Sequence, residues 1–293
     1  MSHYQAGGFT MLPPIVKNLL IINGIMFLAT IVLQANFQIN LNGILGLHWV
    51  QSQDFEWYQV FTYMFMHGSF SHIFFNMFAV WMFGSAVENA WGSKRFLTYY
   101  LITGIGAAVL HYFIMYALEI APTLQLIDSF LQNPGQQTLR ALLNQHQFQM
   151  SSSMHPEITG LFQESESALN AVLQGNTSTR NLEQAYTFIT DYRRHYLNLP
   201  VVVGASGSLF GLLLAFGMMF PNTRLFLIFL PIPIKAKYFV IGYGALELFS
   251  GLRNNPGDNV AHFAHLGGML FGFLLIMYWR KFANDDDSFY KQF

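Results

Sequence analysis

The sequence contains no cysteine and few charged residues. The absence of cysteine excludes a disulfide framework, thiolate nucleophiles and cysteine metal ligands. Charged residues make up 10% of the chain, whereas an ordinary soluble domain has about a quarter. The formal net charge is −1, which argues against a nucleic-acid partner. So few charges cannot cover a soluble surface of this size.

Hydrophobic residues take their place, at 53% of the 293 residues, and phenylalanine alone occurs 30 times. This composition indicates an integral membrane protein. A helix needs about 20 residues to cross ~30 Å of hydrocarbon. Six apolar segments approach this length: residues 15–35, 72–87, 96–118, 206–220, 238–252 and 260–279. We read the first as a retained span, not a cleaved signal peptide, and predict an all-α integral membrane fold with six helices.

The basic residues of the short loops, apart from Arg253, fall on one side of such a bundle, which predicts cytoplasmic termini. The chain then divides into an N-terminal tail, spans one to three with the first loop, an extracytoplasmic insertion, spans four to six, and a C-terminal tail: 1–14, 15–118, 119–200, 201–281 and 282–293. The insertion is rich in Gln, Asn and Ser. Its apolar residues recur at helical spacing, so we expect amphipathic helices there.

Polar side chains within the spans are costly and therefore need a reason. They gather near the extracytoplasmic ends of spans two, four and six: His67, His72, Asn76, Ser206, Ser208, His262 and His265. Three helices thus place polar groups at similar depth. Glu247, within span five, is either a buried hydrogen-bonded carboxyl, a group facing a cytoplasmic cavity, or a catalytic residue. His67 is expected to be structural, and His262 a hydrogen-bonding residue at a helix end.

Small residues recur every fourth position in spans four and six, which lets helix backbones approach closely. These two glycine seams are Gly207, Gly211 and Ala215 in span four, and Gly268 and Gly272 in span six. Seam packing on seam would bring Ser206 close to His265. A helix over 206–220 is short, at about 22 Å. Residues 201–205 would therefore be non-helical, and such backbone is tolerated where it lines a water-filled cavity.

This arrangement suits acyl transfer. A serine hydroxyl becomes a good nucleophile when a base takes its proton, and His265 is the natural base for Ser206. The Ser206 backbone N–H, His72 and Asn76 are candidate donors to the oxyanion. Since the motif around His265 has no Asp or Glu, we predict a Ser–His dyad and not a triad.

Three motifs resemble those of the rhomboid family of intramembrane serine proteases: "HGSFSHIFFN", "GASG" and "AHLGGMLFG". They occur in the family's order and on the corresponding spans. The resemblance implies a six-span bundle that cleaves transmembrane segments of other membrane proteins near their outer ends. It also implies a serine endopeptidase without cofactor or metal, in a prokaryotic plasma membrane, with the active site facing outward.

By resemblance, Ser206 is the nucleophile and His265 the general base. The oxyanion would be stabilised by the His72 and Asn76 side chains and by the backbone amides of Ser206 and Ala205. Supporting positions are Gly204, Gly207 and Phe210, the last where the family often has an aromatic ring against the catalytic histidine. Rhomboids often carry Trp-Arg in the first loop, and this chain has Tyr58-Gln59 there instead. The insertion at 119–200 is also longer than in minimal members.

Other interpretations remain open. Ser206 can be only a small residue at a helix contact, and the chain can be a non-catalytic rhomboid-like binder of membrane proteins. A small transporter would need polar residues through the inner halves of spans two, four and six, where the sequence has almost none. His262 and His265 are spaced as in metal sites. However, the sequence around them has no HExxH pattern and no carboxylate.

Overall fold

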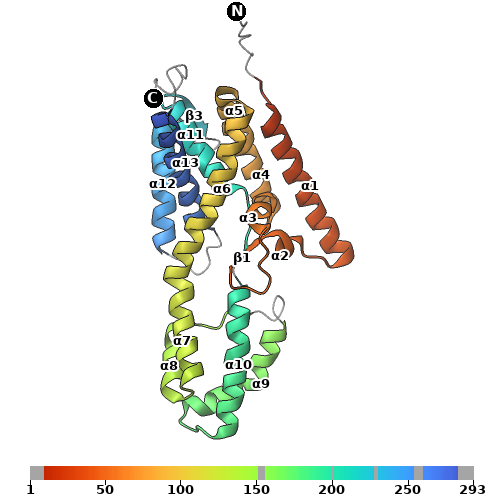
Figure 1. The fold of residues 1–293 in the computed structure, drawn as a ribbon, viewed down its shortest axis with the longest axis vertical. Coiled ribbons are helices and arrows are strands. Elements are labelled where there is room, and N and C mark those ends of the chain that lie inside the picture. Colours follow the sequence, from red (N-terminus) through yellow and green to blue (C-terminus); the bar gives the residue numbers. More distant parts are fainter. Residues whose placement is uncertain (1–9, 151–155, 200, 228–229, 254–259, 283–293) are drawn as a thin grey trace, which may run out of the picture. The chain divides into compact units, whose positions relative to one another are not determined.

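The computed structural model describes residues 10–150, 156–199, 201–227, 230–253 and 260–282, most of them helical (Figure 1). The chain forms two compact units. The first, here called the membrane unit, comprises residues 1–47, 56–112 and 202–293. The second, the insertion unit, comprises residues 48–55 and 113–201.

Most elements along the chain are helices, joined in sequence order. The first half contains α1 (Pro14–Phe37), α2 (Leu41–Leu45), β1 (Leu47–His48), α3 (Gln59–Thr62), η1 (Tyr63–Phe65), α4 (Phe70–Ala79), η2 (Val80–Gly84), α5 (Ser85–Trp91) and α6 (Ser93–Met115). The second contains η3 (Tyr116–Ile120), α7 (Ala121–Gln132), α8 (Gln136–Gln145), α9 (Pro156–Leu173), α10 (Thr179–Asn198), β2 (Val201–Val202), α11 (Ser206–Met219), β3 (Arg224–Leu227), β4 (Leu230–Lys235), α12 (Ala236–Arg253) and α13 (His262–Phe282).

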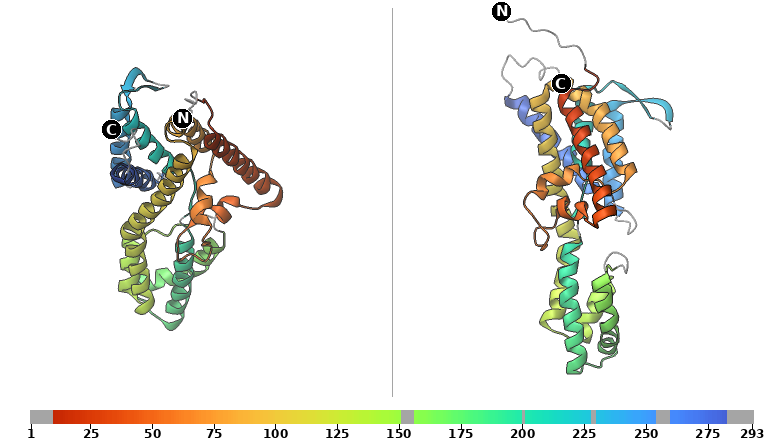
Figure 2. Two further views of the ribbon diagram at one scale, coloured as in Figure 1. Left: turned by 45° about the horizontal axis from the view of Figure 1, so that its top comes forward. Right: turned by 90° about the vertical axis from the view of Figure 1, so that its right-hand side faces the viewer.

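Helices occupy all six segments predicted to span the membrane, so the all-α membrane bundle is confirmed. Four helical stretches are long and apolar enough to cross by themselves: Pro14–Phe37, Phe70–Trp91, Ser93–Gln132 and His262–Phe282. The fourth predicted span, α11, has only 14 residues, as its sequence predicted. Helices α11, α12 and α13 lie side by side in the views of Figures 1 and 2.

The second span is longer than predicted. We expected it to end at residue 87, but the helix continues through a π-helical turn to Trp91, giving 22 residues. We placed the end of the span at residue 87 because polar residues begin there. In the structure they bond to the start of α1 and to the segment before it: Glu88 accepts from the backbone of Ile15 and Val16, and Ser85 donates to the Met11 carbonyl.

The connection between α11 and α12 is an antiparallel hairpin of β3 and β4, with Arg224 opposite Lys235 and Leu225 opposite Ile234. It extends away from the helices in Figure 2. The prolines of "PIPIKAK" predicted that this segment is not helical, which is confirmed, but they gave no sign of the strand pairing. An all-α fold therefore carries one short β-hairpin.

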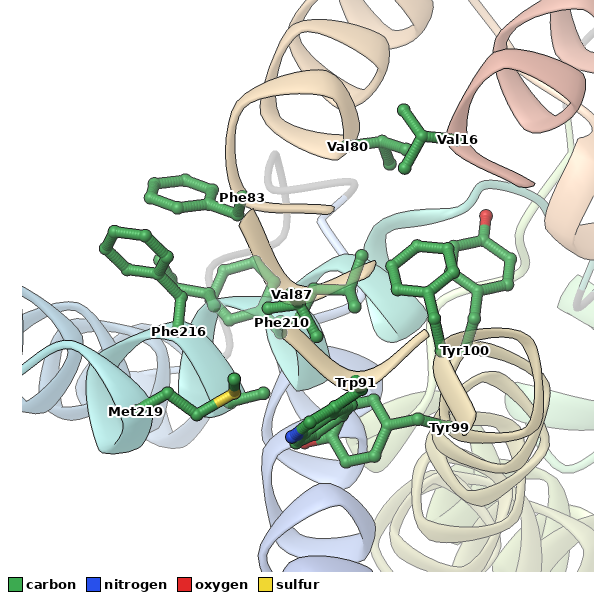
Figure 3. Close-up of a cluster of buried hydrophobic side chains, with 14 of the residues drawn as sticks. Val16, Val80, Phe83, Val87, Trp91, Tyr99, Tyr100, Phe210, Phe216 and Met219 are labelled. Carbon is green, nitrogen blue, oxygen red and sulfur yellow. The ribbon is translucent and has the colours of Figure 1, made fainter. Parts of the chain in front are cut away.

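Aromatic residues fill the core of the membrane unit (Figure 3). Trp91 packs edge-on against Tyr99, with ring centroids 4.9 Å apart, and Phe83 packs edge-on against Phe216 at 5.1 Å. Edge-to-face contacts of this kind are favourable beyond their buried area. Since these residues come from η2, α5, α6 and α11, the core holds the short helix α11 in place from several sides.

The insertion unit has a hydrophobic core of its own. The amphipathic patterns at residues 124–132, 138–145 and 182–196 lie in α7, α8 and α10, so the predicted helices are confirmed. Their apolar faces, together with that of α9, meet in a buried cluster that includes Ile127, Leu139, Phe188 and Tyr192. These helices therefore bury their apolar faces against one another, as a folded unit requires.

Candidate active site

Ser206 is the first residue of α11 and follows a turn that only glycine accommodates easily. Gly204 has φ of +125°, in the region that side-chain-bearing residues avoid. Its N–H donates to the Tyr63 carbonyl at 2.9 Å, which fixes the turn. Ala205 is the N-cap residue. The predicted non-helical backbone before Ser206 is confirmed, and the serine lies where α11 has free N–H groups and a positive dipole end.

Gly204 also brings the turn against His72 and Asn76 of α4. A Cβ at Gly204 would lie 2.7 Å from the His72 Nε2 atom and 3.8 Å from the Asn76 Nδ2 atom. These two side chains therefore line the turn two residues before Ser206. The structure thus brings together the residues that the sequence nominated as oxyanion donors and the serine turn.

A network of polar side chains holds α4 in this position. Asn76 donates from Nδ2 to His67 Nε2 at 3.1 Å, and the His67 ring lies edge-on to His72 at 4.9 Å. Ser69 caps α4 by accepting from the His72 backbone N–H. Since Nδ2 of Asn76 can only donate, Nε2 of His67 accepts. His67 is thus structural, as predicted, and orients the amide of Asn76.

The glycine seams meet each other at their outer ends, where a Cβ on Gly207 would also overlap the Ala107 Cβ of α6. A Cβ on Gly268 would overlap the Gly207 carbonyl, and one on Gly207 would lie 3.6 Å from the Ala264 carbonyl. Deeper in the bundle the prediction of seam on seam is wrong, because α6 lies against both seams. Gly211 faces Thr103 there, and Tyr99 donates its hydroxyl to the Gly211 carbonyl at 2.8 Å.

This outer contact places Ser206 and His265 on facing helix surfaces. Gly207, next to Ser206, approaches the backbone of Ala264, next to His265. One turn into α11, Phe210 stacks on the His265 ring with centroids 4.1 Å apart and planes 7° from parallel. Phe210 shares a helix face with Ser206 because the two are four residues apart. The aromatic contact implied by the resemblance is therefore present.

His265 has a carboxylate partner that its motif did not predict. Glu247 Oε2 of α12 lies 2.8 Å from His265 Nδ1 and 2.7 Å from His262 Nδ1. The predicted dyad rested on the absence of Asp and Glu from the sequence motif around His265, and this carboxylate comes from another helix. A lone glutamate in an apolar span was the available signal. Of the three possibilities left open for Glu247, the structure gives a carboxyl that is 6% exposed and hydrogen-bonded.

The same three side chains have the composition of a small metal site. Their ligand atoms all lie within 4.8 Å of one another. Nitrogen and oxygen donors of this kind suit zinc. The short distances from Glu247 Oε2 to the two Nδ1 atoms can also be explained without a cation. Each imidazole can donate a hydrogen bond from Nδ1 to the carboxylate oxygen.

Ser208 is buried, at 1% exposure, and its hydroxyl donates to the Tyr100 carbonyl at 2.8 Å. Ser206 is half-buried. Of the two serines in this segment, Ser208 is thus engaged in packing α11 on α6, while Ser206 lies on the face that carries Phe210. This difference could not be read from the sequence, where both serines flank Gly207.

Gln59, which stands where rhomboids often have arginine, helps to anchor the first loop. Its side chain is 1% exposed. It donates from Nε2 to the Ile44 carbonyl at 3.1 Å and accepts from the Glu56 N–H at 3.1 Å. An uncharged amide therefore links the two halves of this loop.

Short stretches of the chain are similar to two rhomboid proteins. One stretch of 54 residues is 41% identical to the rhomboid protease GluP of Bacillus subtilis, and covers 18% of this chain and 11% of GluP. A stretch of 50 residues is 36% identical to the putative rhomboid protease YdcA of the same organism, and covers 17% of this chain and 25% of YdcA. The chain thus matches a minor part of each relative's length.

The family model described as the Rhomboid domain matches residues 54–124 and 169–282. These ranges contain the serine turn, the oxyanion candidates, His265 and Glu247. Together with the apolar helices, they identify the protein as an integral membrane protein. Because the matched residues make up more than half of the sequence, the chain belongs to the rhomboid family.

Proposed function

We propose that this protein is an intramembrane serine endopeptidase in which Ser206 is the nucleophile and His265 the general base. The observation that carries the proposal is the approach of α11 to α13 at Gly207 and Gly268, with Phe210 stacked on His265. It supports the pairing of an alcohol at a helix N-terminus with an imidazole on the facing helix. Names of the relatives as rhomboid proteases support the same activity.

In the first step, His265 Nε2 takes the Ser206 hydroxyl proton while Oγ attacks the scissile carbonyl carbon. Nε2 is the free nitrogen because Nδ1 faces Glu247. A tetrahedral intermediate forms, and its carbonyl oxygen becomes an oxyanion. The imidazolium then gives its proton to the leaving amine as the C–N bond breaks, which leaves an acyl ester on Ser206.

The oxyanion needs donors that are in position before the reaction. The Ser206 and Ala205 backbone N–H groups lie at the start of α11, where the helix dipole favours negative charge. The Asn76 amide and the His72 imidazole line the same turn, around Gly204. Loss of one donor of this kind typically lowers kcat by about a hundredfold to a thousandfold.

Water then attacks the ester, with His265 again acting as base, and releases the second product. The half-buried position of Ser206 beside non-helical backbone is suited to water entry. The substrates are transmembrane segments of other membrane proteins. The site opens to the extracytoplasmic side of a prokaryotic plasma membrane, and both termini are cytoplasmic, as the basic loops indicate.

The test is cleavage of a single-span model substrate in proteoliposomes by wild-type protein and by Ser206→Ala, His265→Ala and Ser208→Ala. Ser206→Ala and His265→Ala should abolish cleavage. Ser208→Ala removes only a packing hydrogen bond and should retain most of it. Cleavage that survives Ser206→Ala would contradict a serine protease, and binding without cleavage by the wild type would favour the non-catalytic binder.

A further inference from the structure

The most unusual group in the membrane unit is the carboxylate of Glu247. Its neighbours on α12 point outward: Leu246 is 62% exposed and Phe249 is 59% exposed, whereas Glu247 is 6% exposed. A carboxylate turned inward from an apolar helix is costly unless it is hydrogen-bonded. Its partners are the Nδ1 atoms of His262 and His265. The helix thus turns its carboxylate toward the histidine of the proposed active site.

We propose that Glu247 is a positioning residue that completes a Ser206–His265–Glu247 relay. This inference rests on the proposed serine protease function and adds the group that orients its base. A carboxylate oxygen can only accept hydrogen bonds, so Nδ1 of His265 carries the proton. Nε2 is then unprotonated and able to receive the Ser206 proton. When His265 becomes an imidazolium, the negative charge 2.8 Å from Nδ1 stabilises it.

The ring of His265 is fixed by three different helices. Phe210 of α11 covers its face, Glu247 of α12 holds its Nδ1 edge, and α13 carries it. Tyr243, one turn before Glu247, packs on Phe210 with centroids 4.9 Å apart. Helix α12 therefore restrains the imidazole in two ways. Glu247 bonds to its Nδ1 atom, and Tyr243 supports the Phe210 ring that stacks on it. Such control of the second nitrogen is the role that the third member of a triad performs.

His262 provides a matched control within the same cluster. It donates to the same Oε2 atom at 2.7 Å and is the first residue of α13. If Glu247 were present only to tie α12 to α13, replacing His262 and replacing Glu247 would have comparable effects. A relay predicts that only the contact with His265 affects turnover.

The principal experiment compares Glu247→Gln, Glu247→Asp and His262→Gln with the wild type in the proteoliposome assay. Glu247→Gln keeps the shape but removes the charge and allows the amide to face Nδ1 with its NH₂ group. We expect kcat to fall at least about tenfold with KM within about twofold, and Glu247→Asp to recover part of kcat. His262→Gln, which leaves the contact between Glu247 and His265 in place, should lower kcat less than Glu247→Gln does. Unchanged kcat in Glu247→Gln, with Ser206→Ala inactive, would overturn the relay and leave the protease intact.

A measurement on the wild type covers the case in which the Glu247 variants fail to fold. Nitrogen-15 NMR of histidine-labelled protein reports which ring nitrogen carries the proton, and the His265 signals are assigned by their loss in His265→Asn. The relay requires the proton on Nδ1. A neutral His265 protonated on Nε2 would overturn it.

Activity after treatment with a chelator separates the relay from a metal site. A cation bound by these three side chains would replace the hydrogen bond between Glu247 and Nδ1 of His265, whereas the relay needs no cation and predicts that the metal-free enzyme is fully active. Loss of activity on chelation, restored by added Zn²⁺, would overturn the relay and assign the three side chains to a metal.

Discussion

At the scale of single residues, the site depends on small side chains as much as on reactive ones. Gly204 lets the chain turn sharply before Ser206 and leaves space for His72 and Asn76. Its φ of +125° is one that other residues adopt only under strain. The geometry of the proposed oxyanion site therefore depends on a residue with no side chain.

Replacing Gly204 with alanine should reduce kcat by about a hundredfold, because displacement of catalytic groups by about 1 Å has effects of this size. The added Cβ would lie 2.7 Å from His72 Nε2. The check is kcat in the proteoliposome assay, with Gly68→Ala as control. Gly68 has no atom within 4 Å of a built Cβ and should tolerate the change. Equal activity in both variants would contradict the packing described for His72.

At the scale of elements, the helices begin and end on tertiary contacts that local sequence does not reveal. Helix α1 has proline at its N-cap and no side-chain cap of its own. Glu88, 2% exposed, supplies the cap from α5 by accepting from the N–H groups of Ile15 and Val16 at 3.0 and 2.8 Å, and from Ser93 at 2.7 Å. A carboxylate near a helix N-terminus also interacts favourably with the dipole.

Glu88→Gln should therefore destabilise the protein by about 1.5 to 3 kcal/mol, the usual range for buried hydrogen bonds to a charged group. Thermal unfolding in detergent measures the effect. Glu164→Gln, on an exposed position of α9, is the control and should leave the midpoint unchanged. A Glu88→Gln midpoint equal to that of the wild type would show that α1 does not depend on this cap.

The sequence was enough to predict where the helices lie. It also predicted which polar residues gather near the outer ends of the spans, because polar residues in an apolar span need partners. These are Ser206, His265, His72 and Asn76. Three features could not be predicted. Span two extends past residue 87, where Glu88 accepts from the backbone at the start of α1. Tyr99 of α6 lies against Gly211, where one seam was expected to meet the other. Glu247 reaches His265 from 18 residues away, and such contacts follow from packing, which single-sequence patterns do not encode.

At the scale of the whole molecule, the chain combines a membrane unit with an insertion unit, each with a core of its own. The insertion core includes a polar chain. The Gln149 N–H donates to the Tyr192 hydroxyl at 2.9 Å, which in turn lies 2.7 Å from His146 Nε2. The hydroxyl accepts from Gln149 and has one proton of its own, which it can donate to Nε2 of a neutral His146.

Burial lowers the pKa of His146 below its ordinary value. The unfolded insertion unit therefore binds more protons than the folded one just below pH 6.5, the ordinary histidine pKa. Its stability is fully present above that pH and falls as the solution becomes more acidic. Thermal midpoints at pH 5.5 and 7.5, followed by circular dichroism, should differ less in His146→Gln than in the wild type. An equal difference in both proteins would contradict the role of His146.

The central claim, that Ser206 is the nucleophile activated by His265, is tested most directly by a fluorophosphonate probe with mass-spectrometric mapping of the modified residue. The probe should modify Ser206 in the folded wild type, leave Ser208 unmodified, and fail to react when His265 is replaced by alanine. Modification of Ser208, or reaction at Ser206 with equal rate in His265→Ala, would contradict the account.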